Sequence, residues 1–317
     1  MTSTGASLAI SDPTLEAFAR EVGPAAAPTS DRAGDSDPVT VVGAKTAWDR
    51  GPQLTGIPRE VRAPAGIVAY APEEMTVTVR AGTPVSELAN ALADTGQRCA
   101  LPDRGGTVGG AIAVGENDLL MLGKGRLRDS VLQVRYVSAD GQLVTGGGPT
   151  VKNVTGFDLP RLLTGSLGTL GFLAEVILRT NPSPARSVWY HSDQVDPFAL
   201  HDSLLKPGAI LWDGSETWVL LEGHGVDVEA EADVLRSSGP FAEIDGPPTL
   251  PPHRWSLAPA ELRSLPFDDY VASVGVGTVF AGEPQPPRPI DPVVAEVTAR
   301  LKSQFDPNGR LNPGRSG

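Results

Sequence analysis

Three glycine-bearing loops contain the residues of this chain whose types and spacing could do chemistry. They read VGAKT (42–46), GGTVGGA (105–111) and GSLGTLG (165–171). Glycine lets a backbone approach a ligand closely, and several N–H groups can then point at one anion. The loops therefore favour the binding of a phosphate or pyrophosphate. Because the chain contains 36 glycines, each loop could also be only a turn, and at this stage that alternative stays open.

Two common phosphate-binding patterns do not fit these loops. A P-loop needs glycine directly before Lys-Ser/Thr, whereas Ala44 precedes Lys45-Thr46, and Pro38 stands where the first glycine would be. GGTVGG lacks the G-x-G-x-x-G spacing of the dinucleotide fingerprint, and we interpret its context as a turn rather than a strand leading into a helix. A phosphate ligand must be held by another arrangement.

The elements that position these loops follow from hydrophobic period and capping residues. Asp12-Pro13 is typical of a helix start, and the dipeptide Asp140-Gly141 is typical of a tight hairpin turn. In chain order the predicted elements are a helix at 13–22, strands at 39–42 and 75–80, a helix capped by Thr83-Pro84 that stops at Gly96, a hairpin at 131–145 and a strand at 172–179.

The pattern of apolar and proline residues changes after about residue 181. NPSPAR (181–186) is interpreted as a linker, and the stretch to about 290 mixes short apolar runs with Pro-rich breaks. A smaller second domain is expected there. A closing helix is predicted from Pro292, with Asp291 as its cap and a turn-rich tail after it. Its aligned apolar positions are Val294, Val297, Leu301 and Phe305.

Composition excludes several classes of function. A net charge of −12 without a Lys/Arg cluster argues against nucleic acid as a partner. Cys99 is the single cysteine, which excludes an internal disulfide, a multi-cysteine zinc site and an iron–sulfur cluster held by this chain alone. No secretory signal and no apolar stretch of about 18 residues is present. We therefore expect a cytoplasmic protein without a transmembrane segment.

Taken in order, these pieces resemble the flavin-binding domain of the vanillyl-alcohol oxidase and p-cresol methylhydroxylase (PCMH) superfamily, and in particular the small FAD-binding subunits of bacterial glycolate oxidases. The resemblance runs from about residue 10 to 180 and resumes in the tail. The matching segments are VGAKTAWDRG (42–51), residues 77–103, TVGGAIA (107–113), GRLRDSVL (125–132), KNVTGFDLPRLLTGSLGTLGFLAEV (152–176) and FDPNGRLNPGR (305–315).

The resemblance implies an α+β fold with a PCMH-type FAD-binding domain over 1–182, made of two α/β subdomains that divide near 60–70. A smaller α+β cap-like domain would follow at 183–290, and the helix and tail of 291–317 would pack back on the FAD domain. The cofactor-binding residues that it implies are Val42, Gly43, Ala44, Lys45, Thr46, Asp103, Thr107, Gly109, Gly110, Val114, Gly168, Thr169, Leu170 and Gly171.

Departures from the family pattern also matter. VGENDLLMLGK (114–124) replaces a loop that contains Gly-Pro in relatives, and Phe157 stands where tyrosine is common. The first loop has no histidine, and Cys99 lies outside the matched loops, so FAD is expected to be bound non-covalently. No catalytic residue is assigned. His224 could face a pocket or lie on the surface, Lys152 and Asn153 could contact a cofactor or solvent, Asp158 suits a helix N-cap, and Arg128-Asp129 could form a local ion pair.

The resemblance implies an FAD-binding subunit of a glycolate-oxidase-like 2-hydroxy-acid dehydrogenase complex, in which the flavin carries electrons. Its implied partners are a larger flavoprotein subunit and an iron–sulfur subunit, through which the chain could sit at a membrane. Two alternatives stay open: a flavin-holding or flavin-free scaffold without turnover, and a stand-alone FAD-dependent oxidoreductase. The last would need a base near the flavin, and none is evident.

Overall fold

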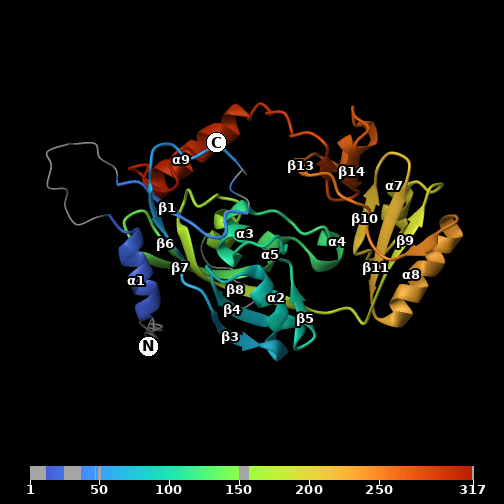
Figure 1. The fold of residues 1–317 in the computed structure, drawn as a ribbon, viewed down its shortest axis with the longest axis horizontal. Coiled ribbons are helices and arrows are strands. Elements are labelled where there is room, and N and C mark those ends of the chain that lie inside the picture. Colours follow the sequence, from blue (N-terminus) through green and yellow to red (C-terminus); the bar gives the residue numbers. More distant parts are fainter. Residues whose placement is uncertain (1–11, 25–36, 47, 49–50, 150–156, 316–317) are drawn as a thin grey trace, which may run out of the picture.

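The computed structural model describes residues 12–24, 37–46, 48, 51–149 and 157–315 (Figure 1). Two β-sheets dominate these residues, one at each end of the molecule. The first is built from the chain up to Pro182, and the second from residues 186–281. Helix α9 and the C-terminal tail return from the second sheet to the first (Figure 1). The cavity described below lies in the first half.

The first sheet has β8 near its centre, with strand order β3-β4-β8-β6-β7 and β5 paired with the end of β8. All of these pairings are antiparallel. The predicted hairpin and the strands predicted at 75–80 and 172–179 are confirmed, although β8 runs on into the expected linker. The strands are β3 (Ile67–Ala71), β4 (Thr76–Arg80), β5 (Gln97–Cys99), β6 (Val131–Val137), β7 (Leu143–Gly147) and β8 (Phe172–Pro182).

The first three residues of β8 alternate between two different cores, as the two-residue period of a strand requires. Leu173 packs with the helices α2, α3 and α6, whereas Phe172 and Ala174 pack with α1 and the first strands of the chain. The helices of this half, with a short 3-10 helix, are α1 (Pro13–Val22), η1 (Pro72–Glu74), α2 (Val85–Ala93), α3 (Val108–Val114), α4 (Met121–Lys124), α5 (Leu127–Ser130) and α6 (Leu159–Leu163).

Helix starts follow the predicted capping with one exception. The Asp12 carboxylate accepts the N–H groups of Thr14 and Leu15, which confirms the cap of α1. Thr83, expected to cap α2, instead accepts the N–H of Gly66 at 2.8 Å, and Pro84 occupies the N-cap position without a side-chain bond. The expectation for Thr83 is therefore wrong, because a tertiary partner competes for its hydroxyl.

A separate parallel pair carries the first glycine loop. In β1 (Val39–Val41) and β2 (Arg59–Val61), Val41 stands opposite Val61. The tail adds a third segment, because Val39 also bridges Leu311 in parallel. The pair thus joins residues that are far apart in the sequence, and the loop after β1 is anchored from both sides.

The second sheet is antiparallel, with strand order β12-β9-β11-β10-β14-β15-β13. Helices α7 and α8 cover one face of it (Figure 1). The elements are β9 (Arg186–Ser192), α7 (Pro197–Ser203), β10 (Ala209–Trp212), β11 (Thr217–Gly223), α8 (Gly225–Ser238), β12 (Ala242–Ile244), β13 (His253–Ser256), the 3-10 helix η2 (Pro259–Ser264), β14 (Tyr270–Ser273) and β15 (Thr278–Ala281).

The two halves are joined by an ion pair and by the segment 114–124. Arg98 of β5 donates to both oxygens of Glu222 of β11, at 2.8 and 2.6 Å, and the Glu222 side chain is only 4% exposed. Leu119 and Leu122 pack against the apolar residues of the second sheet. The segment that departs from the family pattern therefore has a structural role at the junction of the two halves.

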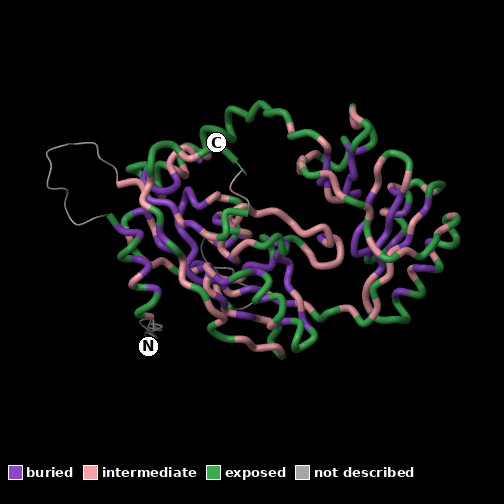
Figure 2. Tube along the Cα trace, in the orientation of Figure 1, coloured by how far each residue is buried: buried purple, intermediate pink, exposed green. Residues whose placement is uncertain are grey.

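Helix α9 (Pro292–Phe305) begins where predicted, with the Asp291 carboxylate accepting the N–H of Val293 at 2.8 Å. Only part of its apolar stripe packs against the rest of the protein. Phe305 packs against the first core, but Val294 and Val297 are 55% and 53% exposed. Most of α9 is exposed along its length (Figure 2). The last turn is held to the body through Lys302, which donates to the carbonyl of Thr169 at 2.9 Å.

Candidate functional site

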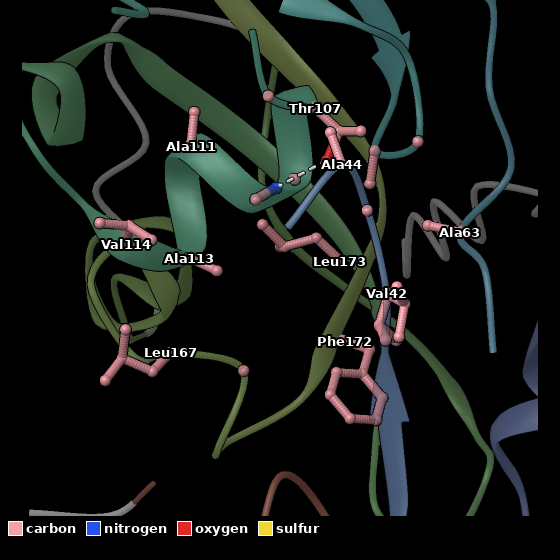
Figure 3. Close-up of a pocket in the computed structure, with 18 of the residues that line it drawn as sticks. Val42, Ala44, Ala63, Thr107, Ala111, Ala113, Val114, Leu167, Phe172 and Leu173 are labelled. Atoms are coloured by element: carbon pink, nitrogen blue, oxygen red, sulfur yellow. Dashed lines mark hydrogen bonds between the residues drawn. The ribbon is translucent and has the colours of Figure 1, made fainter. Parts of the chain in front are cut away.

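A cavity of about 510 Å³ opens where the three glycine loops meet (Figure 3). The first loop leaves β1, the second leads into α3, and the third precedes β8. Eleven of the fourteen residues expected to bind a cofactor line this one cavity. They are Val42, Gly43, Ala44, Lys45, Thr46, Thr107, Gly109, Gly110, Val114, Gly168 and Gly171.

The other three expected residues lie outside the cavity lining. Asp103 is exposed, and its carboxylate accepts the N–H of Gly105 at 3.2 Å. Thr169 is buried and donates its hydroxyl to the carbonyl of Ser166, while Leu170 belongs to the first core. The contacts of these side chains within the protein help to position the loops.

The third loop needs its glycines for the backbone itself. Gly165 and Gly168 adopt φ values of +85° and +70°, a region that side chains disfavour. A Cβ on Gly168 would also lie 2.7 Å from the Asn312 amide nitrogen, and one on Gly171 would overlap the Tyr136 ring. These glycines therefore allow close packing of the loop, and their presence alone does not indicate a ligand.

The second loop opens a helix, so the interpretation of its context as a turn is wrong. The Thr107 hydroxyl caps α3 by accepting the N–H of Gly110 at 3.2 Å. The N–H groups of Val108 and Gly109 donate to backbone carbonyls, and a Cβ on Gly109 would lie 2.7 Å from that of Ala81. Gly109 therefore serves helix packing, whereas a Cβ on Gly110 would meet only the Thr107 hydroxyl, at 3.1 Å, and otherwise open space.

The backbone N–H groups of residues 43–46 in the first loop, unlike those of Val108 and Gly109 in the second loop, donate to no protein acceptor among the described residues. Lys45 in this loop has φ +57°, a conformation that turns successive N–H groups toward one side. Gly43 is half-buried and residues 44–46 are exposed, so solvent can hydrate these N–H groups when no ligand is bound. Four consecutive N–H groups without a protein acceptor at a cavity wall are suited to an anion.

Backbone strain gathers at the same cavity. The described residues other than glycine that have positive φ are Lys45, Met75, Leu167 and Asn312, and all except Met75 line it. Such conformations persist only where the surrounding structure holds them, and they cluster at binding sites. The cavity wall is thus preorganised by its own packing.

Cations outnumber carboxylates on the cavity wall. Lys45, Arg62, Arg104 and Arg315 line it, against Glu116 as the single acidic residue among the lining residues described. Arg104 lies 3.5 Å from Glu116, and Arg315 donates to the Trp48 carbonyl at 2.7 Å. Burial lowers the pKa of Arg315. The wall of this acidic protein is therefore locally positive.

Apolar side chains form the rest of the wall. Val42, Leu167, Phe172 and Leu173 lie around the cavity, together with Ala113 and Val114 of α3 (Figure 3). Sequence reasoning missed Leu167 and Phe172 as lining residues. Both stand inside or beside the GSLGTLG motif, so a broader view of that motif could have included them. A planar apolar group together with an anionic group matches this lining.

Asn312 in the tail holds two cavity walls together. Its side-chain oxygen accepts the Thr40 hydroxyl at 2.6 Å, and its amide donates to the Leu167 carbonyl at 2.6 Å. Its backbone N–H donates to the Val39 carbonyl at 3.0 Å. The amide is buried and its bonds are all satisfied, so this tail residue joins the first strand to the third loop. No local sequence signal pointed to it.

The remaining side chains considered from the sequence are accounted for. Asp158 caps α6 through the N–H of Arg161 at 3.0 Å, as predicted. Arg128 approaches Asp129 at only 4.0 Å between exposed groups, a weak contact. His224 is exposed. Lys152 and Asn153 lie outside the described residues. In the part of the chain that the structure describes, no His, Cys, Asp or Glu cluster suits a metal ion.

Comparison with known proteins relates this chain to flavin-binding proteins. Residues 32–147 match the family described as FAD binding domain. This stretch therefore corresponds to an FAD-binding domain. The expected flavin-binding α+β fold is thereby confirmed.

Relatives match this FAD-binding chain over different lengths. It is 27% identical to glycolate oxidase subunit GlcE of Escherichia coli (strain K12), over 89% of this chain and 93% of that protein. It is 35% identical to glycolate oxidase subunit GlcD of Bacillus subtilis (strain 168), over 55% of this chain but only 40% of that protein. The chain thus spans most of GlcE and less than half of GlcD.

A solved structure shares the fold of the FAD-binding chain. Alkyldihydroxyacetonephosphate synthase superposes with a TM-score of 0.62 at 14% identity, over 87% of this chain and 71% of that one. At this identity the likeness concerns the fold alone.

We predict that Asn312→Ala lowers the free energy of unfolding by about 1–3 kcal/mol, because the Leu167 carbonyl and the Thr40 hydroxyl lose their buried partner. Thermal or urea unfolding measures the loss. Asn308→Ala, an exposed asparagine four residues earlier in the same tail, should change stability by less than about 0.5 kcal/mol. Equal effects of the two substitutions would contradict the bridging role of Asn312.

We predict that Gly110→Val abolishes FAD binding while the melting temperature of the apo-protein stays close to wild type. The side chain would enter the cavity, and only the Thr107 hydroxyl must shift. Gly109→Val is the matched control, because its side chain would strike Ala81 and should destabilise the apo-protein by about 1–3 kcal/mol. An unaltered FAD affinity in Gly110→Val would show that the cofactor lies elsewhere.

Proposed function

We propose that this chain is the FAD-binding subunit of a glycolate-oxidase-like 2-hydroxy-acid dehydrogenase complex. One observation carries the proposal: a chain that matches most of GlcE brings eleven expected cofactor residues to a single cavity. Homology to both GlcE and GlcD supports an FAD-dependent oxidoreductase. We further propose the FAD-binding domain at 1–182 and the cap-like domain at 183–290, in line with the two sheets.

The lining fits FAD on physical grounds. The unpartnered N–H groups of residues 43–46 would receive the pyrophosphate, and glycine at position 110 leaves room beside it. The apolar wall of Leu167, Phe172 and Leu173 would exclude water from the ring system. Bound FAD supplies a two-electron carrier. The residues of this chain bind it, orient it and keep solvent away.

Oxidation of a 2-hydroxy acid also needs a base to take up the hydroxyl proton. None of the four histidines lines the cavity. Glu116 is the single acidic residue among the described lining residues. Its carboxylate is held by Arg104 and lies 4.0 Å from Arg254 of the second sheet. Each of its two oxygens thus faces a guanidinium group of this chain. This favours an electron-carrying subunit over a stand-alone oxidoreductase.

The proposed assembly includes a larger flavoprotein subunit and an iron–sulfur subunit. With one cysteine, this chain cannot supply the ligands of a cluster. GlcE, which this chain matches over most of its length, and the longer GlcD are both named as subunits of glycolate oxidase. The exposed stripe of Ile290, Val293, Val294 and Val297 on α9 and its approach offers apolar surface for a partner.

The proposed location is the cytoplasm, or the membrane surface through the partner subunits. In the chain segments that the structure describes, every helix is too short or too polar to span a bilayer. A non-covalent flavin is part of the same proposal. Cys99 is buried in the first core, outside the cavity lining, and burial raises the pKa of its thiol, which disfavours the reactive thiolate.

We predict that the purified chain is yellow and that its flavin is not bleached by glycolate or lactate under anaerobic conditions. Bleaching should require the partner subunits, because the described residues that line the cavity include no histidine and only one carboxylate, Glu116, which faces two arginines. The visible spectrum measures the flavin before and after each addition. Rapid bleaching of the isolated chain would favour a stand-alone oxidoreductase, and a colourless preparation that takes up no FAD would favour a scaffold.

We predict that acid precipitation releases all of the flavin into the supernatant, because no histidine or cysteine lines the cavity. The absorbance of the supernatant and of the redissolved pellet measures the two fractions. Flavin that stays with the denatured pellet after washing would show a covalent link and would contradict the non-covalent assignment.

A further inference from the structure

Arg62 is the cavity-lining cation that the protein itself does not engage. Among the described residues, its side chain has no hydrogen bond or ion pair. The other lining cations have partners: Lys45 pairs with Glu60 at 3.2 Å, Arg104 with Glu116, and Arg315 with the Trp48 carbonyl. A guanidinium left without a protein partner at a cavity wall is available to an anion from outside the chain.

The strand register places Arg62 next to the first glycine loop. Val41 stands opposite Val61, and the N–H of Val42 donates to the Val61 carbonyl at 2.9 Å. Arg62 follows Val61 directly, just as the loop 43–46 follows Val42. The parallel pairing therefore delivers one guanidinium and four unpartnered N–H groups to the same edge of the cavity.

We propose that Arg62 supplies the counter-charge for the phosphate groups of FAD held by the loop 43–46. This inference rests on the proposed placement of FAD. N–H groups carry only partial charges, and a chain with a net charge of −12 repels a pyrophosphate at long range. A guanidinium offers a full charge and a planar pair of donors that match phosphate oxygens. Arg62 thus offsets locally what the overall charge opposes.

The test is a titration of the full chain, freed of flavin, with FAD at low and at high salt, followed by flavin fluorescence. We expect Arg62→Ala to weaken FAD binding about tenfold at low salt, and much less at high salt, because salt screens an exposed charge. Arg62→Lys should restore part of the affinity, since it keeps the charge but loses the planar donor pair. Arg128→Ala, an exposed arginine outside the cavity lining, is the matched control and should leave the affinity unchanged.

Three results would overturn the proposal. An unchanged FAD affinity in Arg62→Ala would show that the guanidinium does not meet the phosphates. An equal loss at both salt concentrations, with a lowered melting temperature of the apo-protein, would mark a structural defect. A wild-type chain that binds no FAD would contradict the cofactor assignment itself, so the failure of the proposed function is seen before any variant is compared.

Discussion

The structure of the site depends on the buried side-chain amide of Asn312. This amide joins the C-terminal tail, the first strand and the third glycine loop around one cavity. The tail reaches the first strand and the third glycine loop, and Asn312 holds both through hydrogen bonds of 2.6 Å to Thr40 and to the Leu167 carbonyl. Leu167 and Asn312 adopt disfavoured positive φ values that this packing must sustain. The cavity is therefore preorganised, and the ordering cost is met during folding rather than on binding of the cofactor.

An acidic protein can hold an anion because charge and polarity act at different ranges. The net charge sets the long-range potential, which solvent and salt screen over about 8–10 Å. In the proposed placement of FAD, the unpartnered N–H groups of 43–46 and the cations of the wall lie within hydrogen-bonding distance of the phosphates and decide the interaction. This division explains why no basic surface patch is needed.

The junction of the two halves limits what the chain can do by itself. The Arg98–Glu222 pair and the apolar contacts of 114–124 fix the second sheet beside the FAD-binding half. From that sheet, Arg254 approaches Glu116. The carboxylate at the cavity is thus engaged by both halves, which is consistent with a flavin carrier that works within a complex.

Local patterns in the sequence determined most of the elements. Alternation predicted β4, the Asp-Gly pair predicted the β6–β7 hairpin, and Asp12, Asp158 and Asp291 capped helices as expected, because each of these signals acts within a few residues. The order of the glycine motifs also predicted a set of residues of which most line one cavity, because each glycine loop is a short continuous stretch beside a strand.

Tertiary structure alone decided the features that depend on distant partners. Thr83 lost its capping role to Gly66, GGTVGG became the start of a helix packed on Ala81, and half of the apolar stripe of α9 stayed exposed because only the last turn docks. Arg62 and Asn312 reached the cavity through strand register and tail packing. No local pattern encodes such placements, because they arise from contacts between residues that the sequence separates widely.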